Sequence, residues 1–187
     1  MDATRLIRSK GAEPRGFSLI ELMIAMAVLV VGLLGGIVVI GIATANNGRS
    51  KLHTTAVTLA ESTMEKIVAV PKSATGAAAQ TRMADCAGHV FNIQTERGGS
   101  DVIEIGAFAG TIDFSKPPQP DYSMTYVMCS TGGGITYDVR WRIDAEEKPP
   151  DNAPSLQLVT VSAKPVGGNA AASFTLPFTL RQTRGDF

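Results

Sequence analysis

A single long apolar run limits what this chain can fold into. From Phe17 to Ala45 the sequence has 29 residues and only one ionisable side chain, Glu21. As a helix rising about 1.5 Å per residue, the run would be roughly 43 Å long, against a hydrocarbon core of about 30 Å in a bilayer. The run therefore predicts a helix that spans a membrane.

The residues that precede the run carry a positive charge. Residues 1–16 have four basic side chains against two acidic ones, namely Arg5, Arg8, Lys10 and Arg15 against Asp2 and Glu13. The excess favours a cytoplasmic N-terminus, with the bulk of the chain on the other side. Arg49 and Lys51 follow the run and reduce the difference in positive charge between its two ends. The run is also too long for the apolar region of a cleaved secretory signal, which has about 7 to 15 residues.

The start of the run resembles a known processing signal. Gly16-Phe17-Ser18-Leu19-Ile20-Glu21 is similar to the signal of the type IV pilin superfamily, and the similarity covers roughly the first 50 residues. The resemblance implies that a prepilin peptidase cuts between Gly16 and Phe17, and that the new amine of Phe17 is methylated. It also implies that Glu21 pairs with that amine during assembly. The alternative role for Glu21 is a helix cap, because Ser18-x-x-Glu21 matches a capping box.

Within the superfamily, the segment 28–35 is closest to minor pilins of the PilV type, and next to GspI-type minor pseudopilins of type II secretion. The resemblance implies a structural subunit and no enzyme. It implies a single-pass protein of the bacterial inner membrane, with a periplasmic C-terminal domain, and its incorporation into a surface pilus. The implied partners are the prepilin peptidase, other pilins and membrane lipid, with no cofactor and no small-molecule substrate.

Glycines interrupt the apolar run where a helix would favour alanine. Gly32 and Gly36 have the small-xxx-small spacing that lets two membrane helices approach closely. Each glycine costs about 1 kcal/mol of helix propensity relative to alanine. We expect these two residues to lie at a contact with another helix. The alternative is that glycine is simply more frequent in membrane helices.

The helix is predicted to continue beyond the membrane. Apolar residues recur at helical spacing on one side of residues 46–70, namely Leu52, Ala56, Leu59, Ala60, Met64, Ile67 and Val68. Pro71 supplies the stop. The expected organisation is a leader at 1–16, a transmembrane half-helix at 17–45, an amphipathic half-helix at 46–70 and a β-rich domain at 71–187.

Strand patterns dominate the C-terminal part. Residues 135–143 alternate apolar and polar side chains most clearly. The other predicted strands are residues 122–130, 156–164 and 174–180, with Pro177 confining the last to a sheet edge or a bulge, and more weakly 89–95 and 102–108. Residues 72–81, 116–120, 132–134, 147–154 and 167–169 are expected to be connections. A helix followed by consecutive strands predicts an α+β fold, with an antiparallel sheet packed on the exposed half of the helix.

Cys86 and Cys129 are the only thiols. Because the predicted orientation places both outside the cytoplasm, a disulfide between them is the leading interpretation. Two unpaired buried thiols are one alternative. A metal site is the other, because Cys86-x-x-His89 has the spacing of metal ligands and Cys129 would be a third donor.

Other functions have less support from the sequence. A net charge of zero and a pI near 6.7 argue against a dedicated nucleic-acid binder. No nucleophile elbow or phosphate-binding glycine loop is present. Arg140 and Arg142 are expected on the solvated face of a strand, where the rival role is DNA binding in a DNA-uptake pilin. A signal-anchored periplasmic binding module or enzyme is the remaining rival.

Overall fold

The computed structural model describes residues 16–129, 134–148, 153–167 and 176–185. All of the expected leader except Gly16 lies outside the described residues, as do residues 132–133, 149–152 and 168–169 of the expected connections. The chain divides into two compact units, Met1–Thr44 and Ala45–Phe187.

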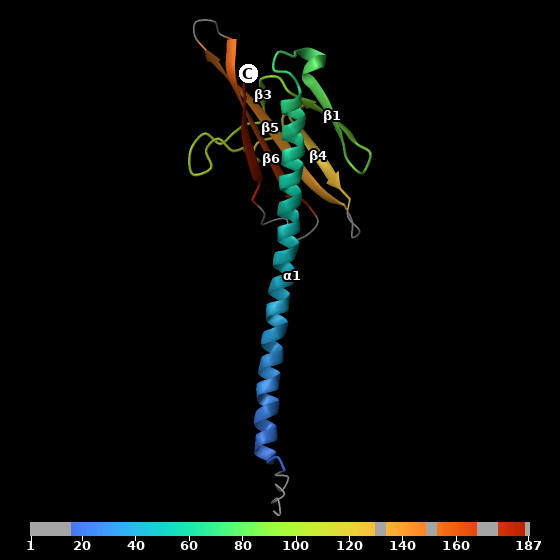
Figure 1. Cartoon of the computed structure of the whole chain (residues 1–187), viewed down its shortest axis with the longest axis vertical. Coiled ribbons are helices and arrows are strands. Elements are labelled where there is room, and N and C mark those ends of the chain that lie inside the picture. Colours follow the sequence, from blue (N-terminus) through green and yellow to red (C-terminus); the bar gives the residue numbers. More distant parts are fainter. Residues whose placement is uncertain (1–15, 130–133, 149–152, 168–175, 186–187) are drawn as a thin grey trace, which may run out of the picture. The chain divides into compact units, whose positions relative to one another are not determined.

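One helix, α1, runs through Leu19–Ala69 (Figure 1). Its 51 residues match the predicted continuous helix to within two residues at each end. The helix ends just before Pro71, which has no amide hydrogen with which to continue the ladder. The segment from Leu19 to Thr44 belongs to the first unit and the segment from Ala45 to Ala69 to the second.

A five-stranded antiparallel sheet forms the centre of the second unit. Its strands are β3 (Gly98–Gly99), β4 (Ser123–Met128), β5 (Ile135–Lys148), β6 (Ala153–Val166) and β7 (Phe178–Gly185). The order is β3-β5-β6-β7, and β4 also pairs with β5. The α+β prediction is therefore confirmed, including an antiparallel sheet packed on the helix.

A two-stranded hairpin lies beside β4 and makes a second, smaller sheet. It pairs β1 (Gln80–Ala84) with β2 (Val90–Gln94). A short 3-10 helix, η1 (Gly76–Ala79), leads into it. The sequence predicts β2. It also predicts that residues 72–81 are a surface connection, which is wrong for residues 80–81, because these belong to β1. Met83 is the one buried side chain in β1, so the strand has no apolar alternation to detect.

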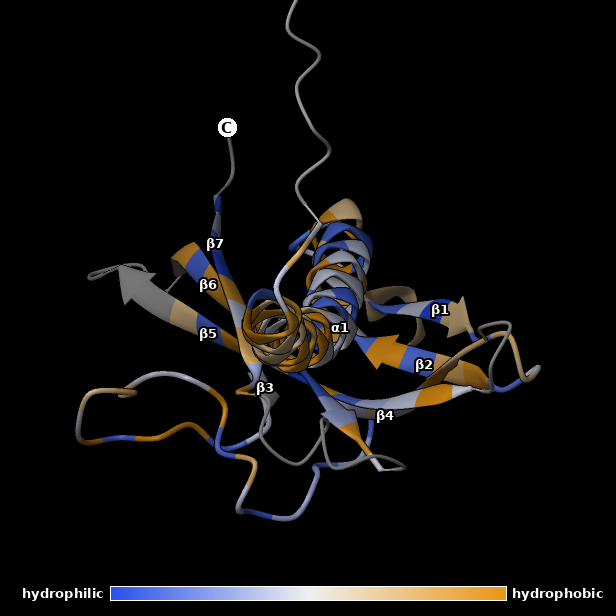
Figure 2. Ribbon diagram, turned by 90° about the horizontal axis from the view of Figure 1, so that it is seen from below, coloured by the Kyte–Doolittle hydropathy of each residue, from blue (hydrophilic) through white to orange (hydrophobic). Residues whose placement is uncertain are grey.

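The core lies between the helix and the concave side of the sheet. The helix contributes its predicted stripe, of which Ala56, Leu59, Ala60, Met64 and Ile67 are buried. The sheet contributes Tyr137, Val139, Trp141, Ile143, Val159, Val161 and Ala163, all with no exposed surface. Figure 2 shows the alternation of hydrophobic and hydrophilic residues along β5 and β6 that produces this one-sided core.

Two strand predictions differ from the structure. Residues 102–108 form no strand and belong to a loop at 101–121, which is held by one isolated bridge between Val102 and Ile112. The strand expected at 174–180 begins only at Phe178, directly after Pro177, and continues to Gly185. Residues 168–175 lie outside the described part of the chain. The expectation that this strand forms a sheet edge is confirmed, because β7 ends the strand order.

Candidate functional site

The start of α1 brings together the residues expected to be processed and paired. The Ser18 carbonyl accepts hydrogen bonds from the amides of Glu21 at 3.0 Å and Leu22 at 3.1 Å. Glu21 Oε2 in turn accepts the Ser18 amide at 3.4 Å. This is the glutamate half of the predicted capping box. The carbonyl of Ser18, rather than its hydroxyl, satisfies the Glu21 amide, so the cap differs from the expected arrangement in one of its two bonds.

The residues around the expected cleavage point are outside the helix and accessible. Gly16, Phe17 and Ser18 have no helical or strand structure, and all three are exposed. The Phe17 side chain retains 87% of its surface. The backbone at the Gly16–Phe17 bond is therefore exposed and lies outside the helix.

The N-terminal half of α1 is apolar on all sides and uncovered. Every residue from Leu19 to Thr44 is exposed, and the most apolar 18-residue window has 0% of its residues buried. This half of the helix is long and apolar enough to cross a membrane. Exposed apolar surface costs roughly 25 cal/mol per Å² in water. The segment therefore needs lipid or other helices around it.

The glycines of this segment leave open space at their surface. A Cβ built on Gly32, Gly35, Gly36 or Gly41 would meet no atom within 4 Å. The described residues thus provide no packing reason for these glycines. The predicted contact of Gly32 and Gly36 with another helix has no counterpart within this chain, and it stays a prediction.

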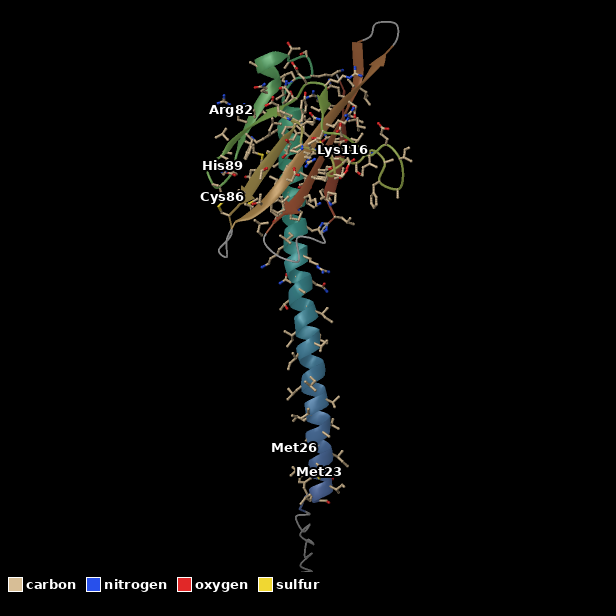
Figure 3. All side chains as sticks on the ribbon, turned by 180° about the vertical axis from the view of Figure 1, so that it is seen from behind. Met23, Met26, Arg82, Cys86, His89 and Lys116 are labelled. Carbon is tan, nitrogen blue, oxygen red and sulfur yellow. A yellow bond between two sulfur atoms is a disulfide. The ribbon has the colours of Figure 1, made fainter. Side chains whose placement is uncertain are left out.

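In the second unit, Cys86 and Cys129 are joined by a disulfide with a Cα–Cα distance of 5.9 Å. The bond connects the turn of the β1–β2 hairpin to the residue that follows β4. Figure 3 shows Arg82, Cys86 and His89 along this hairpin. Both sulfurs are used in the bond. Among the described residues, no group of three or more His, Cys, Asp or Glu is placed to hold a metal ion.

His89 instead pairs with a carboxylate that the sequence did not single out. Asp85 Oδ2 lies 2.8 Å from His89 Nδ1, and Asp85 Oδ1 accepts the His89 amide at 2.8 Å. The amide of Val127 in β4 also donates to Oδ2, at 3.3 Å. Burial acts to raise the pKa of Asp85, but the bonds from His89 and Val127 outweigh it and lower the pKa overall. An aspartate three residues before Gly88 is a turn signal that would have located this carboxylate.

The expectation that Arg140 lies on a solvated face is wrong. Arg140 is only 5% exposed. The loop at 101–121 covers that side of the sheet and contacts the Arg140 side chain. Its guanidinium bonds both oxygens of Asp138 and donates to the carbonyl of Lys116 at 2.7 Å. Arg142 is more open and donates to Asp144 Oδ1 at 2.7 Å. Arg140 is thus occupied within the chain and does not offer a surface for DNA phosphates.

An aromatic ring of the same loop, that of Phe114, contacts two cationic side chains of the sheet. The Arg140 guanidinium lies 4.9 Å from the centre of the Phe114 ring, and the Lys164 ammonium lies 5.8 Å from it. Ile112, two residues earlier, is buried. The sheet is therefore covered by the helix on one side and partly by this loop on the other, which the sequence pattern did not predict.

A second buried arginine joins the end of α1 to the last strand. Arg184 is 8% exposed, and its Nη1 donates to the carbonyls of Ile67 and Val70, at 2.8 Å each. Its Nε donates to Oε1 of Gln157 at 3.0 Å. These carbonyls belong to the last turn of the helix and the residue after it, where intrahelical donors are missing. No local sequence signal marks this residue, because the two helix carbonyls that it bonds are 117 and 114 positions away.

One comparison with known proteins finds a match. Residues 14–37 match the model of the prokaryotic N-terminal methylation motif. The matched range includes Gly16, Phe17 and Glu21, and it ends inside the uncovered apolar half of α1. No curated protein and no solved structure matches the chain.

Proposed function

We propose that this chain, which carries the prokaryotic N-terminal methylation motif of the type IV pilin superfamily, is a minor pilin of the PilV type that acts in pilus assembly or initiation. The observation that carries the proposal is the position of the motif, at the start of an apolar half-helix that no described residue covers. Proteins with this motif are structural subunits that are processed by a prepilin peptidase and assemble with other pilins. In this role the helix is first a single-pass membrane anchor and later a packing element.

The first step is processing. The N-terminus lies in the cytoplasm, and the peptidase cleaves the bond between Gly16 and Phe17. The exposed, non-helical backbone at these residues supports this step, because the bond is reachable without unwinding α1. The Phe17 amine released by cleavage is then methylated.

The second step uses Glu21. A carboxylate in the membrane costs on the order of 2.5 to 3.5 kcal/mol, so it needs a compensating charge. Glu21 Oε2 already reaches the Ser18 amide at 3.4 Å, and the amine of Phe17 is only one residue earlier. Because Glu21 is exposed, its carboxylate is equally open to the amine of a neighbouring subunit. Pairing between subunits draws one helix out of lipid and aligns it with the next.

The third step is helix packing and presentation of the domain. Gly32 and Gly36 provide a face without side chains on which a second helix can pack closely. The domain that follows is placed in the periplasm, an oxidising compartment in which a bond between Cys86 and Cys129 persists. The chain catalyses no reaction in this scheme.

The alternative is a minor pseudopilin of a type II secretion system. The methylation motif occurs in both classes, so the match at residues 14–37 favours neither over the other. Purification of the full-length protein with its membrane neighbours separates them by the identity of the partners. A DNA-uptake role receives no support from Arg140, which is buried and bonded within the chain.

Processing is tested by mass spectrometry of the membrane-extracted protein from cells that contain a prepilin peptidase. The expected N-terminus is a methylated Phe17, and Gly16→Val should leave the full precursor. Gly48→Val is the matched control, because a Cβ at either glycine meets nothing within 4 Å. Wild-type protein that keeps residues 1–16 in such cells refutes the proposal.

Assembly is tested separately with Glu21→Ala. Insertion and cleavage should remain, while recovery with partner pilins should fall severalfold, because the amine loses its counter-charge. Glu61→Ala is the control, since Glu61 is an exposed acid on the same helix outside the apolar half. Equal recovery of partners with both variants would remove the pairing role of Glu21.

A further inference from the structure

The polar stretch that follows the apolar half of α1 carries positive charge and no negative charge. Arg49, Lys51 and His53 lie within eight residues of Ala45. No Asp or Glu occurs from residue 22 to residue 60. On a helix, side chains contact others three or four positions away, so none of these basic residues has an acidic neighbour on α1.

The described part of the domain does not neutralise these charges either. Arg49, Lys51 and His53 are exposed. Within the described ranges, their side chains take part in no recorded hydrogen bond or ion pair. By contrast, Arg140, Arg142 and Arg184 in the sheet all bond to side chains or carbonyls of the same chain. Within the described residues, Arg49 and Lys51 therefore differ from these three arginines in having no partner in the chain.

The domain begins to contact the helix at Leu52, directly after Lys51. The Tyr137 hydroxyl donates to the Leu52 carbonyl at 3.4 Å, and Ala56 is the first fully covered helix residue. Residues 46–51 thus belong neither to the apolar run nor to the buried stripe. They are the part of α1 that directly follows the segment able to cross a membrane.

We propose that Arg49 and Lys51 each bind the phosphate groups of anionic phospholipids, on different sides of α1, because residues two apart on a helix do not face each other. The polar headgroup region begins where the hydrocarbon ends, so basic residues that directly follow a spanning segment meet lipid phosphates. The Arg49 guanidinium binds phosphate oxygens through paired N–H groups, and the Lys51 ammonium acts as a compact charge. These two contacts hold the unassembled subunit at a defined depth. This inference rests on the membrane anchoring in the proposed function, and it does not depend on assembly.

The test uses the full chain in bilayers of phosphatidylcholine with a minor fraction of phosphatidylglycerol. Electron paramagnetic resonance of spin-labelled lipids measures which lipid is preferred in the motionally restricted shell around the helix. Wild-type protein should select phosphatidylglycerol, and the selection should weaken as salt is added. Arg49→Gln with Lys51→Gln should reduce the preference by up to roughly 25-fold, because each of the two basic residues at an anionic surface contributes roughly a fivefold factor.

The matched control is Arg82→Gln with Lys116→Gln, which removes the same two charges from exposed positions in the hairpin and the loop labelled in Figure 3. The control should keep the wild-type preference. Restricted lipid without a preference for phosphatidylglycerol, or an equal loss in the control, overturns the inference. An unchanged lipid preference in the Arg49/Lys51 variant, together with weaker recovery of partner pilins, also overturns it and assigns these charges to an acidic protein partner. Absence of any restricted lipid refutes the membrane anchor itself.

Discussion

Replacement of Arg184 by methionine should destabilise the domain by about 3 kcal/mol. Its Nη1 makes two 2.8 Å bonds to the carbonyls of Ile67 and Val70. Hydrogen bonds from a charged donor contribute about 1.5 to 3 kcal/mol each. Methionine leaves both carbonyls without this donor, but it also removes the cost of burying a guanidinium, so the lower part of the 3 to 6 kcal/mol range is expected.

The assay is urea unfolding of the full chain in detergent micelles, followed by tryptophan fluorescence. Trp141 is the only tryptophan and is fully buried, and its Nε1 donates to the Gln94 carbonyl at 2.9 Å. Its emission therefore reports unfolding of the core. Hydrogen exchange at residues 67–70 should rise more than elsewhere in α1, because the end of the helix loses its capping donor.

The control is Arg181→Met, three residues earlier on the same strand. Arg181 is exposed, and its recorded bond is a 3.5 Å contact from Nη2 to the Ala109 carbonyl. This substitution should change the free energy of unfolding by less than about 0.5 kcal/mol. Equal effects of the two substitutions, or a loss below about 1 kcal/mol for Arg184→Met, would refute the reasoning.

Three further outcomes follow from the structure. Cys86→Ser with Cys129→Ser should lower the free energy of unfolding by about 4 kcal/mol, as expected for two cysteines separated by 43 positions, and reductant should have no further effect on the variant. Asp85→Asn should lower stability at pH 7 and reduce the loss of stability below about pH 4. Folding lowers the pKa of Asp85, so its contribution is present above about pH 4 and disappears as acid protonates the carboxylate in the folded state. An unchanged acid dependence of the urea midpoint would contradict this. Gly32→Leu with Gly36→Leu should leave the unfolding midpoint unchanged, because no atom lies within 4 Å of either added Cβ. The same variant should associate more weakly with partner helices in a co-purification assay. Full association would show that the glycines are not at a contact.

The most predictable parts of the fold were those set by a repeating local pattern. The apolar run has the length and composition of a spanning helix, the stripe from Ala56 to Ile67 has helical spacing, and α1 follows both closely. Strand β5 follows a clear alternation, and its inward side chains are buried as expected. A strand without such a pattern was missed: β1 has one buried residue and depends on pairing with β2.

The candidate site likewise has residues that the sequence predicts and residues that it does not. Gly16, Phe17 and Glu21 are recognisable from the sequence because the motif is contiguous, and the match at residues 14–37 rests on the same residues. The prediction that Arg140 lies on a solvent-exposed strand face is wrong. Alternation correctly assigns it to the outer face of β5, but it cannot show that the loop carrying Phe114 folds over that face.

The sequence alone determined the long helix, its apolar half and the position of the processing motif, because each depends on neighbours within a few residues and on the fixed rise of a helix. Tertiary structure alone decided which charges are used inside the chain. Arg184 reaches the end of α1 across 117 positions, and Asp85 reaches β4 across 42. Partners this distant leave no periodic trace in the sequence, since they meet only when burial of the sheet against the helix brings them together.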